Sequence, residues 1–406
     1  MAVITYLLPA VALASTVAAQ CSNSATLTIT ASSDASDLAS CTTYSGSVAI
    51  PTGLSVNPDG NGHQQLSVDG VQKITGNLTV TNVDQLASLS FSELKSIGGF
   101  ELGQLTVLSE LSFPQLTQVG AMNFTALPAL QSLSFGGTGV TQADSILITN
   151  TGLSSLQGIN NLKSVTSFNI NNNQALQNIS LMVTSIKGSL DIEANDGFVS
   201  GLMTTFPMLE TAKNMTFRNC SSVSLPSLAN VSEDLGFYGN TMKTFMAPNL
   251  TTVGGLVFVD NTELTNISIP DLTSVNQSYQ IANNTMLKMI NGFPKLRTVK
   301  GALDFEGNFT EVDLPALQEV DGAFTLSTSA TFDCSAFDED KKSKKVIRGK
   351  YSCKSKQAKP GSSGSKASSS SGSSPTGQSA AGHVDVSYPV VLGTTSFLAG
   401  LLALAL

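Results

Sequence analysis

Residues 248–269 read PNLTTVGGLVFVDNTELTNISI, and phrases of this kind recur along most of the chain. Each copy contains two phrases. The first is an apolar triplet such as Leu256-Val-Phe258, followed three residues later by an asparagine such as Asn261, and the second has the form Pro-x-Leu-x-x-Val. A unit of about 22 residues is too small to bury its own apolar face, so it must stack on copies of itself. The repeat therefore predicts a solenoid.

Three short apolar segments in each unit alternate with turn residues, and their period of two with many β-branched residues indicates strands. The units are too short to hold a helix beside these strands. We therefore predict an all-β fold, a right-handed parallel β-helix or leucine-rich-like solenoid of about 12 coils. The coils are expected to begin near Leu78, Leu102, Met122, Ile146, Phe168, Leu190, Met215, Leu235, Leu256, Tyr279, Leu303 and Phe324.

The sixth position of the first phrase is predicted to form an internal ladder. An amide side chain turned inward at a corner can bond the backbones of its own coil and the next, which satisfies buried polar groups. Leucine-rich repeats accept asparagine or cysteine at such a place. The predicted ladder residues are Asn173, Asn195, Cys220, Asn240, Asn261, Asn284 and Asn308.

Five cysteines in a secreted chain suggest two disulfides and one remaining thiol. A solenoid must close its open ends, and one pair lies near each end of the repeat. Cys21 with Cys41 and Cys334 with Cys353 are therefore expected to close caps near residues 21–41 and 334–353. Cys220 is then a buried ladder thiol, and the alternative is a reactive or intermolecular cysteine.

The two ends of the chain carry processing signals. Residues 1–19 are apolar and end in Val-Ala-Ala, which is typical of a secretory signal peptide. Residues 354–379 are rich in Ser, Gly and Lys and should form a disordered stalk. The solenoid ectodomain is thus expected to span residues 20–353.

Residues 380–406 combine small residues, a polar spacer and an apolar tail, which predicts a GPI-attachment propeptide. Ser379 is the preferred attachment residue, with Gly377 and Ala380 as alternatives. A tail-anchoring helix is the competing interpretation, although Pro and Gly residues interrupt a short span. Either way, the expected partner is a lipid of the plasma membrane.

The body of the chain contains eleven Asn-x-Ser/Thr sequons, which predict a glycan-coated surface. Asn308 is both a sequon and a predicted ladder residue, so we expect it to be buried and to carry no glycan. The ten predicted glycosylation sites are Asn77, Asn123, Asn178, Asn214, Asn219, Asn230, Asn249, Asn266, Asn276 and Asn283.

The composition restricts the partners. Charged residues make up 12% of the chain and the net charge is −8, which makes nucleic acid a poor partner. Basic residues nevertheless cluster between residues 341 and 359, before the stalk. This cluster is either a solvated collar or an adhesion site for anionic groups at the membrane or in the wall. We expect a monomer that needs no cofactor.

Two carboxylate pairs are the strongest candidates for catalysis, Asp191 with Glu193 and Asp304 with Glu306. Each pair spans about 7 Å on one strand face, a separation compatible with inverting glycosidases. However, the pairs lie five coils apart, and neither has an expected Arg, His or aromatic neighbour at its position in adjacent coils. The chain has two histidines, His63 and His383, and neither completes a triad or a zinc site. We therefore predict no enzyme activity.

Ligand binding is the other alternative to a scaffold. The outward strand positions are mostly Ser, Thr, Asn and Gln, with Tyr238 and Tyr279 expected to be exposed aromatics. Such faces suit hydrogen bonding to a wall polysaccharide such as β-glucan, but plain solvent exposure produces the same pattern.

The order of features resembles the fungal GPI-anchored cell-wall organisation proteins, the family of an extracellular-mutant protein and its sporulation-specific relatives. The likeness spans nearly all of residues 20–406 and rests on phrases such as LTTVGGL (250–256) and LRTVKGAL (296–303). The repeat is also similar to the L domains of growth-factor receptors, which implies a β-helical solenoid. The resemblance implies a non-catalytic surface glycoprotein needed for wall integrity, held in the plasma membrane and partly cross-linked to wall glucan.

Overall fold

The computed structural model describes residues 21–22, 24–195 and 201–355. The predicted signal peptide, the attachment residues Gly377, Ser379 and Ala380, the propeptide and all of the stalk after residue 355 lie outside these described residues.

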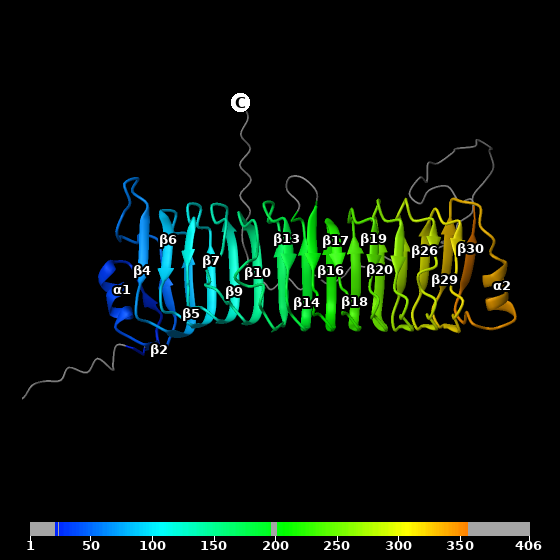
Figure 1. The fold of residues 1–406 in the computed structure, drawn as a ribbon, viewed down its shortest axis with the longest axis horizontal. Helices are drawn as coiled ribbons and strands as arrows, with labels where there is room; N and C mark the ends of the chain where they lie inside the picture. Colours follow the sequence, from blue (N-terminus) through cyan, green and yellow to red (C-terminus); the bar gives the residue numbers. More distant parts are fainter. Residues whose placement is uncertain (1–20, 23, 196–200, 356–406) are drawn as a thin grey trace, which may run out of the picture. The chain divides into compact units, whose positions relative to one another are not determined.

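The described chain is a stack of short strands between two end helices, as Figure 1 shows. Every pairing between the named strands is parallel. The largest sheet contains β1 (Leu27–Thr28), β2 (Thr43–Tyr44), β3 (Val48–Ile50), β5 (Lys73–Thr81), β7 (Ser96–Gly103), β9 (Gln118–Leu127), β10 (Gln142–Thr151), β11 (Ser164–Val165), β12 (Ser167–Asn171), β14 (Ser185–Glu193), β16 (Thr211–Arg218), β18 (Asn230–Tyr238), β20 (Thr252–Val259), β22 (Ser274–Val275), β23 (Tyr279–Ala282), β25 (Thr298–Val299), β26 (Leu303–Gly307), β28 (Glu319–Val320), β29 (Phe324–Thr328) and β30 (Tyr351–Lys354).

A further face, called the third face below, is built from the middle segment of each repeat. Its strands form four short sheets because the segments between them are irregular. They are β4 (Gln64–Val68), β6 (Leu86–Phe91) and β8 (Glu110–Ser112), then β13 (Asn178–Ser180), β15 (Leu202–Thr205) and β17 (Cys220–Ser224), then β19 (Thr244–Met246) and β21 (Asn266–Ser268), and finally β24 (Met289–Ile290) and β27 (Glu311–Val312).

The strand register confirms the predicted solenoid and corrects its length. The first apolar residue of each triplet pairs with its equivalent in the next coil, which gives about 14 turns rather than 12. The second coil was also assigned wrongly, because Leu78 pairs with Phe100 and not with Leu102. The paired column is Leu27, Val48, Leu78, Phe100, Met122, Ile146, Phe168, Leu190, Met215, Leu235, Leu256, Tyr279, Leu303, Phe324 and Tyr351.

The core runs along the inside of the stack as one continuous apolar cluster. In its middle, the ring of Phe237 lies between those of Phe217 and Phe258, with centroids 5.4 and 4.7 Å away. Glycine occupies the corner after the Val phrase where two backbones approach closely, since a Cβ at Gly120 would lie 2.1 Å from the Gly98 carbonyl oxygen. At such a close approach a side chain cannot be accommodated.

Each end is closed by a disulfide and a short helix. Cys21 bonds Cys41 beside α1 (Ser32–Ala39), and Cys334 bonds Cys353 beside α2 (Ser335–Lys342). Each closed loop of about 20 residues removes unfolded-state entropy equivalent to about 3 kcal/mol. The predicted all-β solenoid with disulfide-closed caps is confirmed, and the two short helices lie at the caps, whose sequences follow no repeat.

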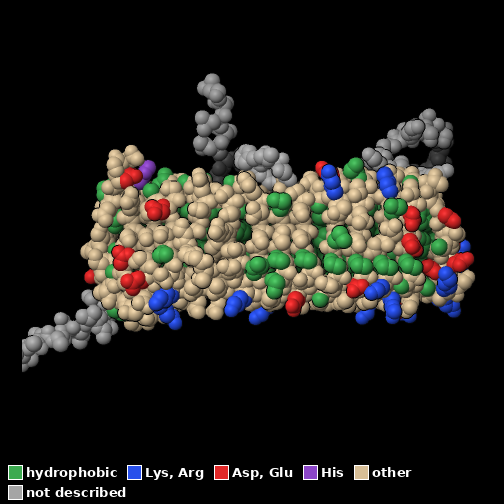
Figure 2. Space-filling model, in the orientation of Figure 1, with side chains coloured by type: hydrophobic (Ala, Val, Ile, Leu, Met, Phe, Trp, Pro, Cys, Tyr) green, Lys and Arg blue, Asp and Glu red, His purple; other side chains and the backbone are tan. Residues whose placement is uncertain are grey.

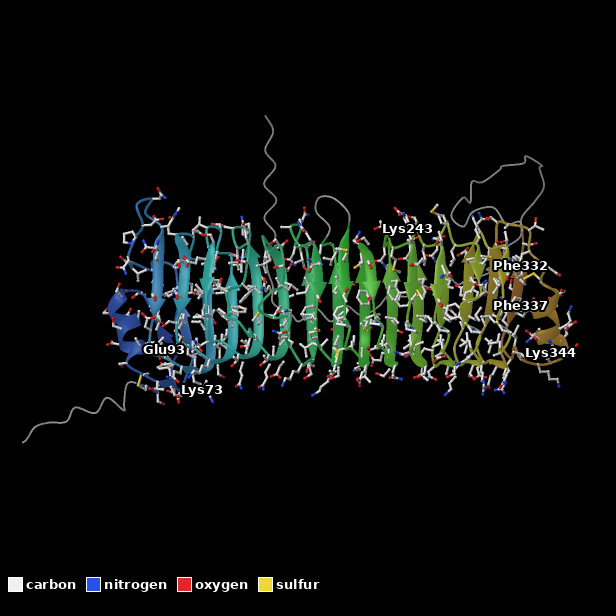
Figure 3. All side chains as sticks on the ribbon, in the orientation of Figure 1. Lys73, Glu93, Lys243, Phe332, Phe337 and Lys344 are labelled. Carbon is white, nitrogen blue, oxygen red and sulfur yellow. A yellow bond between two sulfur atoms is a disulfide. The ribbon has the colours of Figure 1, made fainter. Side chains whose placement is uncertain are left out.

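Aromatic packing and one hydrogen bond attach α2 to the last coil. Phe337 is buried against Phe324, with ring centroids 4.9 Å apart, and Figure 3 shows Phe332 and Phe337 together at this end. The hydroxyl of Tyr351 on β30 donates to the carboxylate of Asp338 on α2 (2.8 Å). This hydrogen bond lowers the pKa of Asp338, while burial and the carboxylate raise the pKa of Tyr351. The last apolar coil is thereby sealed from water.

Candidate functional surface

The first carboxylate pair belongs to a charged and aromatic row across three strands. Asp191 and Glu193 alternate with buried residues on β14, so both side chains face outward. The Arg218 Nε lies 3.4 Å from a Glu193 oxygen, and the Arg218 guanidinium lies 4.3 Å from the centre of the Tyr238 ring. The prediction that this pair has no Arg or aromatic neighbour at the same position was wrong. Glu193 is therefore engaged in an ion pair.

The second pair lies at the same strand position five turns further along, as predicted. Burial raises the pKa of the Asp304 carboxyl. Burial also raises the pKa of Glu306, and the charge of Asp304 adds to this effect. Five turns at the spacing of parallel strands separate the two pairs by about 24 Å, too far for joint action on one glycosidic bond.

The raised pKa of Asp304 predicts a pH-dependent stability difference. Above its folded pKa the buried carboxylate costs stability, and this cost disappears as the pH falls through that value. Asp304→Asn should therefore raise the melting temperature at pH 7, and by less at about pH 4, where the wild-type carboxyl is becoming protonated. Thermal unfolding of both proteins at the two pH values measures this. An equal increase in melting temperature at both pH values would contradict the raised pKa of Asp304.

Tyr279 does not serve as an exposed aromatic. It is the buried first residue of its triplet, with rings of Phe293 and Phe305 at 5.3 and 5.0 Å. Its hydroxyl is buried without a hydrogen-bond partner, and burial raises its pKa well above the usual value. The sequence prediction failed because tyrosine occupies a position that is Leu, Met, Ile or Phe in neighbouring coils.

The residues described contain no group of three or more His, Cys, Asp and Glu that could hold a metal ion. His63 directly precedes β4, and its Nδ1 lies 3.4 Å from a carboxylate oxygen of Asp59. A hollow of about 380 Å³ beside α1 is lined mainly by serines, together with small or apolar side chains, one Asn and one Gln, and Asp69 is its acidic residue. None of these places assembles a nucleophile with a base.

The predicted ladder is present as two hydrogen-bonded runs of buried side chains. The Asn261 Oδ1 accepts from the Asn240 backbone N (3.0 Å) and Nδ2 (2.8 Å), and its own Nδ2 donates to the Phe237 carbonyl (3.0 Å). The same pattern links the members of each run. One run is Thr151, Asn173 and Asn195, and the other is Cys220, Asn240, Asn261 and Asn284.

The burial of Asn308 differs from the prediction for the C-terminal end of the ladder. Asn308 is half-buried, and the next residue, Phe309, is fully buried instead. In the earlier coils the residue before the ladder position has a left-handed backbone, as at Asn283 (φ 56), and this turns the next side chain inward. Gly307 does not adopt that conformation, and the Phe309 ring packs against it. The burial argument for an unglycosylated Asn308 is therefore wrong.

Cys220 is buried and lies outside both disulfides. Its backbone N donates to the Asn240 Oδ1 (2.8 Å), so it occupies the ladder position without supplying an amide. A maleimide should therefore label no cysteine in the native protein and one after unfolding in denaturant, counted by intact mass. Labelling of the native protein would contradict the buried assignment.

The predicted glycosylation sites lie on several edges of the solenoid. Asn77, Asn178, Asn219, Asn249, Asn266, Asn276 and Asn283 are exposed, and Asn123, Asn214 and Asn230 are half-buried. In contrast, no sequon asparagine lies at the second or fourth position of the first phrase on the strands from β12 to β29, and we call these positions the bare face. Asn214 and Asn230 lie before these positions on β16 and β18. The residues of the bare face are Asn169, Asn171, Asp191, Glu193, Thr216, Arg218, Gly236, Tyr238, Val257, Val259, Gln280, Ala282, Asp304, Glu306, Thr325 and Ser327.

Part of the basic cluster before the stalk is paired within the C-terminal cap. Lys342 and Lys344 lie 3.4 and 3.2 Å from carboxylates of Asp338 and Asp340 on α2. Lys341 donates instead to three backbone carbonyls of residues 347–349. Figure 2 shows red and blue side chains intermixed at this end. These contacts favour the solvated collar over an adhesion site for anionic groups, since neighbouring carboxylates already offset the charge.

No helix among residues 21–22, 24–195 and 201–355 is both long and apolar enough to cross a lipid bilayer.

Comparisons with known proteins identify the relatives of this chain. The family model described as Ecm33, GPI-anchored cell wall organization protein, matches residues 1–39. The BspA-type leucine-rich repeat model matches in six copies, over residues 76–190 and 203–308. No solved structure matches the chain.

Three curated proteins show the extent of the similarity. The chain is 44% identical to a cell surface GPI-anchored protein of Arthroderma benhamiae, over 89% of each chain. It is 41% identical to the protein ecm33 of Aspergillus fumigatus, over 91% of each chain. It is 32% identical to the cell wall protein ecm33 of Schizosaccharomyces pombe, over 79% of this chain and 73% of the relative.

Proposed function

The chain belongs to the Ecm33 family of GPI-anchored cell wall organization proteins, and we propose that it serves the wall as a non-catalytic, N-glycosylated scaffold on a GPI tether. Its place at the cell surface and its role in wall organisation follow from the family. The absence of catalysis, the tether and the glycans on named asparagines are the parts that we propose.

One observation carries the non-catalytic proposal. The two carboxylate pairs lie five turns apart, and in the first pair Glu193 is engaged with Arg218. The second pair, Asp304 with Glu306, has only Gln, Ala, Thr and Ser as register neighbours, so no Arg, His or aromatic side chain lies beside it to hold a sugar. A hydrolase needs an acid and a base across one bond. What the fold offers instead is a long stack of strands. On the side shown in Figure 2, charged side chains are sparse and most of the surface is neither charged nor hydrophobic, apart from a row of hydrophobic side chains. Such a surface suits a structural element in a hydrated wall.

Enzymatic release tests the tether. Phospholipase C specific for inositol lipids should move the protein from a membrane fraction into the soluble fraction. A variant that ends at residue 379 should instead be secreted without treatment, because it lacks the apolar tail. Protein that stays in the membrane after lipase treatment, with no pool covalently bound to wall glucan, would contradict a GPI anchor.

A second candidate function is binding of a wall polysaccharide by the bare face. That face offers amide and carboxylate side chains together with Tyr238, in a region where no predicted glycan stands in the way. Asn171→Ser would complete a sequon that begins at Asn169 and would place a glycan on the face. Asn171→Ala is the matched control, because it removes the same amide and adds no sequon.

Co-sedimentation with insoluble β-glucan measures this second function. If the bare face binds the polymer, the wild type and Asn171→Ala should sediment with it, and glycosylated Asn171→Ser should remain in solution. Equal sedimentation of all three proteins would place any glucan contact elsewhere on the surface.

A further inference from the structure

The most exposed large apolar side chains among the described residues are all methionines. Three of them, Met203, Met246 and Met289, point outward from the third face and have 53, 58 and 48% of their surface exposed. Other outward residues of the third-face strands from β13 to β27 are Asn, Ser, Thr or Glu. Each of the three thus offers a flexible, apolar and polarisable surface on an otherwise polar sheet.

Two sequons lie directly beside these methionines. Asn178 on β13 is the register partner of Met203 on β15, so their Cα atoms are about 4.8 Å apart across the sheet. Met246 on β19 is the register partner of Ser268, the hydroxyl residue of the sequon that begins at Asn266. On the other side of Asn266, the next strand is β24, which begins with Met289. Each of the three methionines therefore lies on a strand adjacent to a sequon strand.

We propose that N-linked glycans on Asn178 and Asn266 fold back over the third face and cover Met203, Met246 and Met289. The first sugar of an N-glycan is an N-acetylglucosamine, which presents a ring face of C–H groups and an acetyl methyl group. Both can pack on a thioether chain, and methionine adapts its rotamers to an irregular surface. The chain's own modification thus supplies the cover.

The consequence is protection from oxidation. A solvent-exposed methionine is oxidised readily to its sulfoxide, which makes the side chain polar. A glycan that lies on the thioether excludes peroxide from the sulfur. At an oxidant-exposed cell surface, these two glycans would keep the three methionines of the third face in the reduced thioether form. This inference rests on N-glycosylation, which is one part of the proposed function.

The test measures sulfoxide formation at each methionine by peptide mass spectrometry during mild peroxide treatment of the folded, glycosylated protein. Ser180→Ala and Ser268→Ala each abolish one sequon and keep its asparagine. Ser180→Ala should raise oxidation of Met203 several-fold and leave Met246 and Met289 unchanged. Ser268→Ala should raise oxidation of Met246 and Met289 several-fold and leave Met203 unchanged. Met182, which is 50% exposed and lies outside the third-face strands, is the internal control.

Equal oxidation of Met203 in the wild type and Ser180→Ala, with Asn178 shown to be glycosylated, would overturn the proposed cover. Glycopeptide mapping of the same samples separates this outcome from failure of glycosylation itself. An unoccupied Asn178 and Asn266 beside occupied sequons elsewhere would also overturn the inference, while the glycoprotein assignment would stand. A chain without any glycan would contradict both.

Discussion

Asn261→Ala should lower the free energy of unfolding by about 3 kcal/mol or more, because it leaves several buried groups without partners. The Asn240 backbone N–H and amide lose their shared acceptor, and the Phe237 carbonyl loses a donor. All of these groups lie inside the stack, where water cannot replace the lost bonds. The effect should also reach neighbouring coils, since each ladder residue fixes the backbone of the one before it.

Urea unfolding followed by circular dichroism measures this loss. Asn291→Ala is the matched control, since Asn291 is an exposed asparagine close to the ladder in sequence and belongs to no sequon. The control should change stability by less than about 0.5 kcal/mol. A ladder variant as stable as the control would show that the amide stack contributes nothing to folding.

Phe237→Ala should cost about 3–5 kcal/mol through lost burial and the cavity left behind. The ring touches aromatic neighbours in three directions, Phe217, Phe245 and Phe258, with centroids 5.4, 4.4 and 4.7 Å away. Backbone pairing with β16 and β20 prevents the site from collapsing around a smaller side chain. The loss should therefore lie in the upper part of the range.

Differential scanning calorimetry compares Phe237→Ala with Met286→Ala, a truncation at a side chain that is 53% exposed. The core variant should melt well below the wild type and the surface variant within about 1 °C of it. Equal melting temperatures for the two variants would mean that the aromatic column is not part of the cooperative core.

The repeat phrase was sufficient to predict the solenoid, its parallel strands and most of the ladder, since the same pattern of apolar, ladder and turn residues recurs in each copy. Prediction failed where a coil departs from that pattern. Asn308 has the expected sequence position, but the corner before it lacks the left-handed residue, so Phe309 is buried instead. The cap helices were missed for a related reason, because residues 32–39 and 335–342 carry no repeat signal.

The candidate surface was less predictable than the fold. The contact between Glu193 and Arg218 follows the regular register of the first phrase, since each residue lies three positions after its coil start, Leu190 or Met215. The burial of Tyr279 was not predicted because a tyrosine side chain has both a polar and an apolar part. Its place in the paired column of first triplet residues determines that it is buried. In both cases the expected coil starts already fixed the register, and the predictions failed because these side chains were judged by residue type and not by their position in the coil.

Complementation of a fungal strain that lacks this protein tests the central claim of a non-catalytic wall scaffold most directly. The variant to compare with the wild type replaces all four candidate carboxylates, Asp191→Asn, Glu193→Gln, Asp304→Asn and Glu306→Gln. Growth on a dye that binds and weakens the wall is the readout, with surface display of each protein verified by antibody. The scaffold account predicts that the fourfold variant restores growth as fully as the wild type. Loss of growth with a folded, surface-displayed variant would contradict it.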